Sequence, residues 1–230
     1  MANLISLGRN CCVAYNIKKY NNNNKYPTHF FDWLRTDFKC VLYILNSRTI
    51  DMMFNSKNFI VDNKSWKIQG NIGITLKNFI KNDLCLLFHH DVITKKDGDD
   101  DDDDEMTNKL NEFADKYKRR FNRLINLIET QTDTCFIYHN NLDTDFDYDD
   151  CIEFNRIIKS INKNNNYVLV LLLNDTYDNI DYEYIKNEYY IKINLKHFAI
   201  KDIANDWTLP IYDWMKVINL IQDIINNSAF

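Results

Sequence analysis

The sequence predicts an α/β fold in which a mainly parallel sheet lies between helices on both faces, a three-layer, Rossmann-like arrangement. Short apolar runs of strand length alternate along the chain with longer segments whose apolar residues recur every three or four positions. Several short runs are apolar throughout, as expected for strands covered on both faces. This alternation favours parallel strands joined by crossover helices. A chain of 230 residues, 45% of them hydrophobic, fits a single domain over 1–230.

The N-terminal part begins with a strand, a turn and a helix. The run from Asn3 to Gly8 is apolar and ends in glycine, and the apolar residues from Asn10 to Tyr20 share one helical face. The aromatic stretch from Pro27 to Leu34 is expected to pack in the core, and Asp37 to Asn46 has the pattern of a second helix. Residues 49–82 show neither the apolar spacing of a helix nor that of a strand.

The rest of the chain continues the alternation. The continuous apolar run from Asp83 to His90 predicts a buried strand of the parallel sheet. Asn108 to Glu129 is the strongest helix, with apolar residues at spacings of three and four. Further strands are expected at Cys135 to His139, Val168 to Leu173 and Tyr190 to Leu195, with helices at Ile152 to Ile161 and from Pro210 onward.

The charge pattern argues against a nucleic-acid partner. The net charge is −5, and most of the excess acid lies at Asp97 and from Asp99 to Glu105. We expect this segment to be an acidic surface-loop insertion at about 95–106, because closely spaced like charges repel one another. The basic residues between Lys116 and Arg123 are interpreted as the solvated face of a helix, so no basic face for nucleic acid is expected.

The sequence also predicts a cytoplasmic location, which for a viral protein means the host cytoplasm or the virion. The N-terminus lacks the pattern of a signal peptide, and no apolar run is long enough to span a membrane. The six cysteines lie mostly in apolar segments without zinc-ligand spacing. We therefore expect reduced thiols, no metal site, no cofactor and no membrane partner.

Cys11 lies where the first strand has ended and the first helix begins. Free N–H groups and the helix dipole at that position lower a thiol pKa, which makes Cys11 a candidate nucleophile and the most reactive cysteine. The carboxyl edge of a parallel sheet is also where ligands bind. The alternative is a capped helix start with a half-buried thiol, and Cys12 is interpreted as inward-facing packing.

His90 is the candidate general base, because His89, His90 and Asp91 end the predicted strand. Successive strand residues point to opposite faces, so only one of the two histidines can serve a given site. The alternative is a strand-end histidine bonded to a backbone carbonyl. His139 and His197 are interpreted as structural.

Asp32 lies among aromatic residues, between Phe31 and Trp33. An unpaired buried carboxylate is costly, so we expect Asp32 to be buried and hydrogen-bonded. Two roles remain open: Asp32 orients a histidine, or it caps a helix that begins at Trp33.

Together these segments resemble a family of "putative papain-like cysteine peptidases" with members in bacteria, some eukaryotes and giant viruses. The resemblance rests on Ser6-Leu7-Gly8 with Asn10 and Cys11, on Pro27 with Phe31-Asp32-Trp33, on His90-Asp91, and on the paired arginines within Tyr117 to Phe121. It covers roughly residues 4–125. The chain departs from the family pattern by inserting Thr28-His29-Phe30 and the acidic segment, and the first insertion shifts Asp32 relative to Cys11.

The resemblance implies a thiol-dependent hydrolase or transferase that acts on an amide or ester bond of a peptide, glycan or small molecule. In it, Cys11 would be the nucleophile, His90 the base and Asp32 or Asp91 the orienting acid, with N–H groups of the first helix as oxyanion donors. The substrate-binding residues would be Gly8, Arg9, Asn10 and Trp33. The label also implies a papain-like fold, whereas the alternation predicts a parallel sheet, and we retain the sheet.

The alternative function comes from another class. A binding module for a nucleotide, sugar phosphate or glycan would use the turn from Gly8 to Cys11 as an anion site, with Arg9 and Asn10 and without the thiol. A domain that modifies glycans or nucleotide sugars lies between the two functions.

Overall fold

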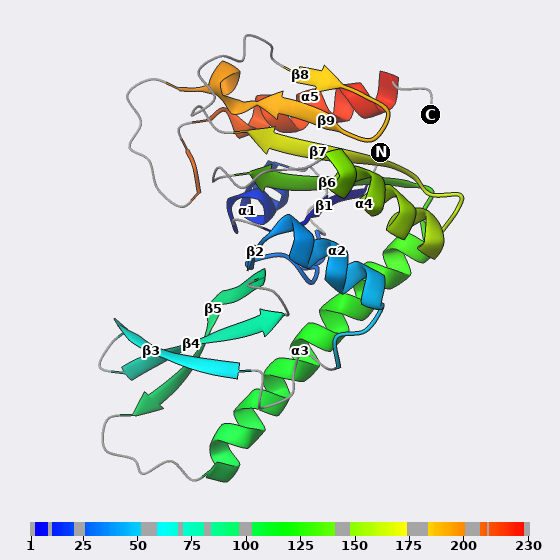
Figure 1. The fold of residues 1–230 in the computed structure, drawn as a ribbon. Helices are drawn as coiled ribbons and strands as arrows, with labels where there is room; N and C mark the ends of the chain where they lie inside the picture. Colours follow the sequence, from blue (N-terminus) through cyan, green and yellow to red (C-terminus); the bar gives the residue numbers. More distant parts are fainter. Residues whose placement is uncertain are drawn as a thin grey trace.

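The computed structural model describes residues 3–8, 11–20, 26–51, 59–68, 71–80, 84–96, 103–140, 148–173, 184–200, 208–210 and 212–227. The strands between 59 and 96 are described by their backbone. In chain order the elements are β1 (Asn3–Ser6), α1 (Cys11–Tyr20), β2 (Arg35–Thr36), α2 (Phe38–Ser47), β3 (Phe59–Ile68), β4 (Asn71–Ile80), β5 (Leu84–Lys96), α3 (Asp103–Thr130), β6 (Asp133–Asn140), α4 (Tyr148–Ile161), β7 (Asn166–Leu173), β8 (Tyr184–Lys186), β9 (Ile191–Asn194), a 3-10 helix (Leu195–Phe198) and α5 (Trp214–Asn227) (Figure 1).

A five-stranded sheet in the order β1-β6-β7-β9-β8 forms the centre of the molecule. The strands β1, β6, β7 and β9 pair in parallel, and β8 joins β9 antiparallel at the edge. The mainly parallel sheet and its crossover helices confirm the predicted α/β class. No helix in the described part of the chain is long and apolar enough to cross a lipid bilayer.

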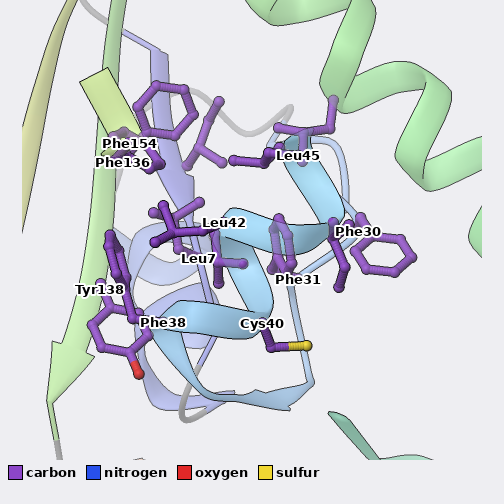
Figure 2. Close-up of a cluster of buried hydrophobic side chains, with 14 of the residues drawn as sticks. Leu7, Phe30, Phe31, Phe38, Cys40, Leu42, Leu45, Phe136, Tyr138 and Phe154 are labelled. Carbon is purple, nitrogen blue, oxygen red and sulfur yellow. The ribbon is translucent and has the colours of Figure 1, made fainter. Parts of the chain in front are cut away.

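Helices cover both faces of this sheet and bury two separate apolar clusters. Leu4 of β1 packs with α1 and α5 in one cluster, and Ile5 packs with α2, α3 and α4 in the other. Figure 2 shows part of the second cluster, in which the ring of Phe38 lies 5.0 Å from that of Tyr138. The alternation of Leu4 and Ile5 between faces is the ordinary consequence of strand geometry. The sheet is therefore the middle of three layers.

A second sheet was not predicted. It is four-stranded, in the order β2-β5-β4-β3, and all its pairings are antiparallel. Figure 1 shows β3, β4 and β5 away from the central sheet, on the side where α3 extends. The part of the predicted run from Leu84 to His90 thus belongs to β5, and its assignment to the parallel sheet was wrong. An apolar run indicates a strand but does not specify its pairing partner.

The described structure differs from the predicted loop at about 95–106 at both of its ends. The strand β5 continues to Lys96, and Asp103 to Glu105 already lie in the first turn of α3. Carboxylates are favourable there because the amino end of a helix carries partial positive charge. The intervening residues 97–102 lie outside the described residues.

Gly8 makes the turn that connects β1 to α1. Its φ is +87°, in the region that disfavours side chains. A Cβ atom at this position would lie 3.0 Å from Thr36 Oγ1 and 3.3 Å from the Leu34 carbonyl oxygen. Glycine therefore permits both the backbone conformation and the close approach of the segment that contains β2.

We predict that Gly8→Ala lowers the free energy of unfolding by about 1–3 kcal/mol, because a side chain strains this backbone conformation. Urea denaturation would measure the loss. The double variant Gly8→Ala/Thr36→Ala should recover the loss of stability that arises from the close contact with Thr36. The loss that arises from the strained backbone should remain. Equal stability of Gly8→Ala and the wild type would show that the turn is not constrained in this way.

Candidate functional site

The candidate site lies at the carboxyl edge of the parallel sheet, where β1 and β6 end and α1 begins. Ser6 pairs with Ile137, and the Leu7 N–H donates a 2.9 Å hydrogen bond to the Ile137 carbonyl oxygen just beyond the end of β1. This bond holds the Gly8 turn beside the last residues of β6. The first turn of α1 consequently faces the end of β6.

Cys12 and His139 meet at this edge. Cys12 Sγ lies 3.6 Å from His139 Nδ1, a hydrogen-bond contact whose direction depends on the tautomer of the ring. Cys12 is the second residue of α1, and His139 is the next-to-last residue of β6. Both side chains are 0% exposed. A thiol beside an imidazole is the combination that activates a cysteine nucleophile in covalent catalysis.

Burial favours the neutral form of the Cys12 thiol. Burial raises the pKa of the Cys12 thiol well above its usual value, and neighbouring Cys11 raises it further. The backbone N–H groups of Val13 and Cys12 act in the opposite direction by hydrogen bonding to the sulfur. A buried thiolate loses its hydration, which is why burial raises this pKa.

Cys11 differs from the expectation based on its helix position. Its side chain is half-buried, and burial raises its pKa, while its own backbone N–H acts to lower it. Desolvation therefore outweighs the effect expected from the helix amino end. The sequence shows where a helix begins but not how much protein covers its first turn.

The expected partners of Cys11 belong to the second sheet. His90 and Asp91 lie inside β5, with His89, and not at the end of a strand parallel to β1. Their side chains lie outside the described residues, so the pairing of Cys11 with His90 stays a prediction. Arg9 and Asn10 also lie outside the described residues.

Sequence reasoning interpreted Cys12 as packing and His139 as structural. The available signal was that His139 ends a predicted strand, just as Gly8 follows the first one. What the sequence could not give was the strand order that makes β1 and β6 neighbours. That pairing joins segments about 130 residues apart, and it decides which histidine contacts the first helix.

Asp32 lies beside β1 and is 0% exposed. Its Oδ2 accepts a 2.8 Å hydrogen bond from the His29 N–H, and its Oδ1 accepts a 3.0 Å hydrogen bond from the Tyr26 hydroxyl. The same Tyr26 oxygen accepts a 3.4 Å bond from the Ser6 N–H of β1. The prediction that Asp32 is buried and hydrogen-bonded is confirmed, and the carboxylate is linked to the strand that leads to the site.

Neither role left open for Asp32 matches these contacts. No helix begins at Trp33, which has a φ of 67° and lies in a turn, and the next helix begins at Phe38. The cap role is therefore wrong. In the described structure the carboxylate contacts a hydroxyl and a backbone N–H and not an imidazole ring.

Burial dominates the electrostatics around Asp32. It raises the pKa of Asp32 to about 7, although the His29 N–H, the Tyr26 hydroxyl and the charges of Arg120 and Arg123 act to lower it. Burial and, to a smaller extent, the charge of Arg123 lower the pKa of His29 to about 4. The imidazole Nδ1 of His29 is buried without a hydrogen-bond partner.

The site gathers no set of ligands for a metal within the described ranges, where no three His, Cys, Asp or Glu side chains come together. Among the described residues, no disulfide joins Cys11, Cys12, Cys40, Cys135 and Cys151. Cys40, Cys135 and Cys151 lie in the two apolar clusters, as small core residues do.

A family model described as "Putative papain-like cysteine peptidase (DUF1796)" matches residues 2–181. The matched range includes Cys12, Asp32 and His139. No curated protein and no solved structure matches the chain significantly.

We predict that Asp32 makes the protein less stable as the pH rises. The native state keeps the Asp32 proton up to about pH 7, whereas the usual pKa is 3.8, so between these values the native state binds more protons than the unfolded chain. The free energy of unfolding therefore falls by roughly 4 kcal/mol across this range because of Asp32. Urea denaturation at a series of pH values should show that Asp32→Asn gains stability relative to the wild type as the pH rises.

His29 provides the matched control, because its shift has the opposite sign. A histidine whose pKa is lowered from 6.5 to about 4 destabilises the native state as the pH falls through this range. His29→Gln should thus gain stability relative to the wild type toward low pH. A difference between Asp32→Asn and the wild type that does not vary with pH would contradict the burial of an Asp32 proton.

Proposed function

The chain belongs to the family of putative papain-like cysteine peptidases (DUF1796), and from this premise we propose that it is a thiol-dependent hydrolase or transferase in which Cys12 is the nucleophile and His139 the general base. The observation that carries the proposal is the 3.6 Å contact between Cys12 Sγ and His139 Nδ1. It supplies what the family description requires, a cysteine within reach of a base. The bond attacked is an amide or ester of a peptide, glycan or small molecule.

The proposed reaction has two steps. His139 Nδ1 takes the Cys12 proton as the sulfur attacks the carbonyl carbon, and the imidazolium then gives that proton to the leaving amine or alcohol. The same imidazole then deprotonates a water molecule, which attacks the resulting thioester. The acid is released, and the imidazolium returns the proton to the leaving Cys12 thiolate. In a transferase another hydroxyl or amine replaces water.

The start of α1 contributes to both steps. The N–H groups of Cys12 and Val13 act on the Cys12 sulfur and favour its negative charge. The positive end of the helix also favours an oxyanion on the carbonyl under attack. Since Cys12 and His139 are 0% exposed, a substrate reaches the sulfur only after the side chains that cover the pair move.

Two alternatives remain as proposals of lower rank. In one, Cys11 is the nucleophile, with His90 as its base and Asp91 as the orienting acid. In the other, the turn from Gly8 to Cys11 binds an anion without covalent chemistry. The second is favoured by one observation: the Thr36 hydroxyl, next to Gly8, is buried and has no hydrogen-bond partner.

We predict that p-nitrophenyl acetate acylates Cys12. Mass spectrometry of the trapped enzyme should find the acetyl group on Cys12, and Cys12→Ala should abolish it while Cys11→Ala keeps the wild-type rate. His139→Ala should slow acylation about 100-fold at neutral pH, because a positioned base contributes about that much. In this variant the rate should keep rising above pH 9, since burial raises the pKa of the thiol above 9.0.

The same experiment separates the alternatives. Acylation of Cys11 that is lost in His90→Ala would replace the proposed pair by Cys11 and His90. Absence of acylation at both cysteines in a folded protein would reject the hydrolase and leave the anion-binding module.

A further inference from the structure

A cavity of ≈230 Å³ lies between α1 and the segment that leads into α5. Its walls come from the last two turns of α1, from Thr208 and Pro210, and from Tyr212 to Trp214. Drug-sized ligands fill pockets of about 300–1,000 Å³, so this cavity has room for one ring with a small substituent. It lies on the face of the sheet covered by α1 and α5.

We propose that this cavity binds a ligand that consists of one flat ring with an anionic substituent. The proposal does not depend on the chemistry of Cys12. It adds a binding site to the candidate catalytic site and identifies the class of molecule that the site takes.

The walls favour a flat ring. Tyr15, Tyr20, Tyr212 and Trp214 all line the cavity, and aromatic side chains attract other rings through stacked and edge-to-face contacts. The ring of Trp214 and the backbone of Tyr212 are held in place before a ligand arrives. The indole N–H of Trp214 donates a 3.0 Å hydrogen bond to the Leu209 carbonyl oxygen, and Tyr212 pairs with Ala199 in a β-bridge. A preformed wall loses little entropy on binding.

The charges favour an anion. The Lys19 ammonium lies 4.9 Å from the ring centre of Tyr20 and 5.8 Å from that of Tyr15, and within the described structure it has no carboxylate partner. The acid in the lining, Asp213, is already compensated: its Oδ2 lies 3.3 Å from Lys216 Nζ, and its Oδ1 accepts a hydrogen bond from the Lys216 N–H. The unpaired charge at the cavity is therefore positive.

One side chain joins this cavity to the candidate catalytic site. The amide of Asn16, which lines the cavity, donates hydrogen bonds of 2.8 Å to the Cys12 carbonyl oxygen and 3.0 Å to the Thr208 carbonyl oxygen. The cavity is thus held one helical turn from Cys12. This position suits a site for a ring of the substrate or for a separate effector, and the binding itself is the same in both cases.

The test compares phenyl phosphate with its two parts, phenol and inorganic phosphate, in NMR titrations of the full chain. Phenyl phosphate is expected to bind more tightly than either part. Lys19→Glu should weaken the binding of phenyl phosphate about fivefold or more, because it replaces an attractive charge by a repulsive one. The binding of phenol should not change. Tyr15→Ala should weaken the binding of both phenyl phosphate and phenol about two- to tenfold.

Matched controls on the same molecule are Lys18→Glu and Tyr43→Ala. Lys18 is an exposed neighbour of Lys19 outside the cavity, and Tyr43 is a half-exposed tyrosine on α2. Both should bind phenyl phosphate like the wild type, as should Cys12→Ala, which separates this proposal from the thiol chemistry. Equal binding of the three probes, no saturable binding of phenyl phosphate, or equal effects of Lys18→Glu and Lys19→Glu would overturn the proposal.

Discussion

The parallel pairing of β1 with β6 is the constraint on which the rest of the site depends. It is extended by one bond beyond the strand, from the Leu7 N–H to the Ile137 carbonyl oxygen, and this fixes the Gly8 turn against the end of β6. Because Gly8 turns the chain sharply, α1 begins at the sheet edge with Cys12 against His139. A displacement of this one strand would separate the thiol from the imidazole.

The segment with β2 supports this geometry from the outer side of β1. Tyr26 links the Ser6 N–H to the buried Asp32 carboxyl, and Thr36 lies against Gly8. Asp32 is thus linked through Tyr26 to the backbone of β1, and burial raises its pKa. A buried carboxyl group such as that of Asp32 is costly when it is charged. The stability that Asp32 gives to this segment therefore depends on pH.

Local features could be predicted from the sequence. The turn at Gly8, the beginning of a helix near Cys11 and the burial of Asp32 between aromatic residues all follow from short patterns. The α/β class follows from their repetition. The second sheet could not be predicted, because residues 49–82 follow neither period and the apolar run at Asp83 to His90 is equally suitable for either sheet. The contact of Cys12 with His139 can be predicted only when the strand order is known. The raised pKa values of Cys11 and Cys12 can be predicted only when the residues that cover them are known.

The central claim is that the imidazole of His139 contacts the thiol of Cys12, and nitrogen NMR of histidine-labelled protein tests it most directly. The Nδ1 signal of His139, assigned with His139→Gln, should move when Cys12 is replaced by Ala, because the ring loses its hydrogen-bond partner, and should stay in place in Cys11→Ala. An Nδ1 signal that is unchanged in Cys12→Ala, or that moves only in Cys11→Ala, would contradict the account.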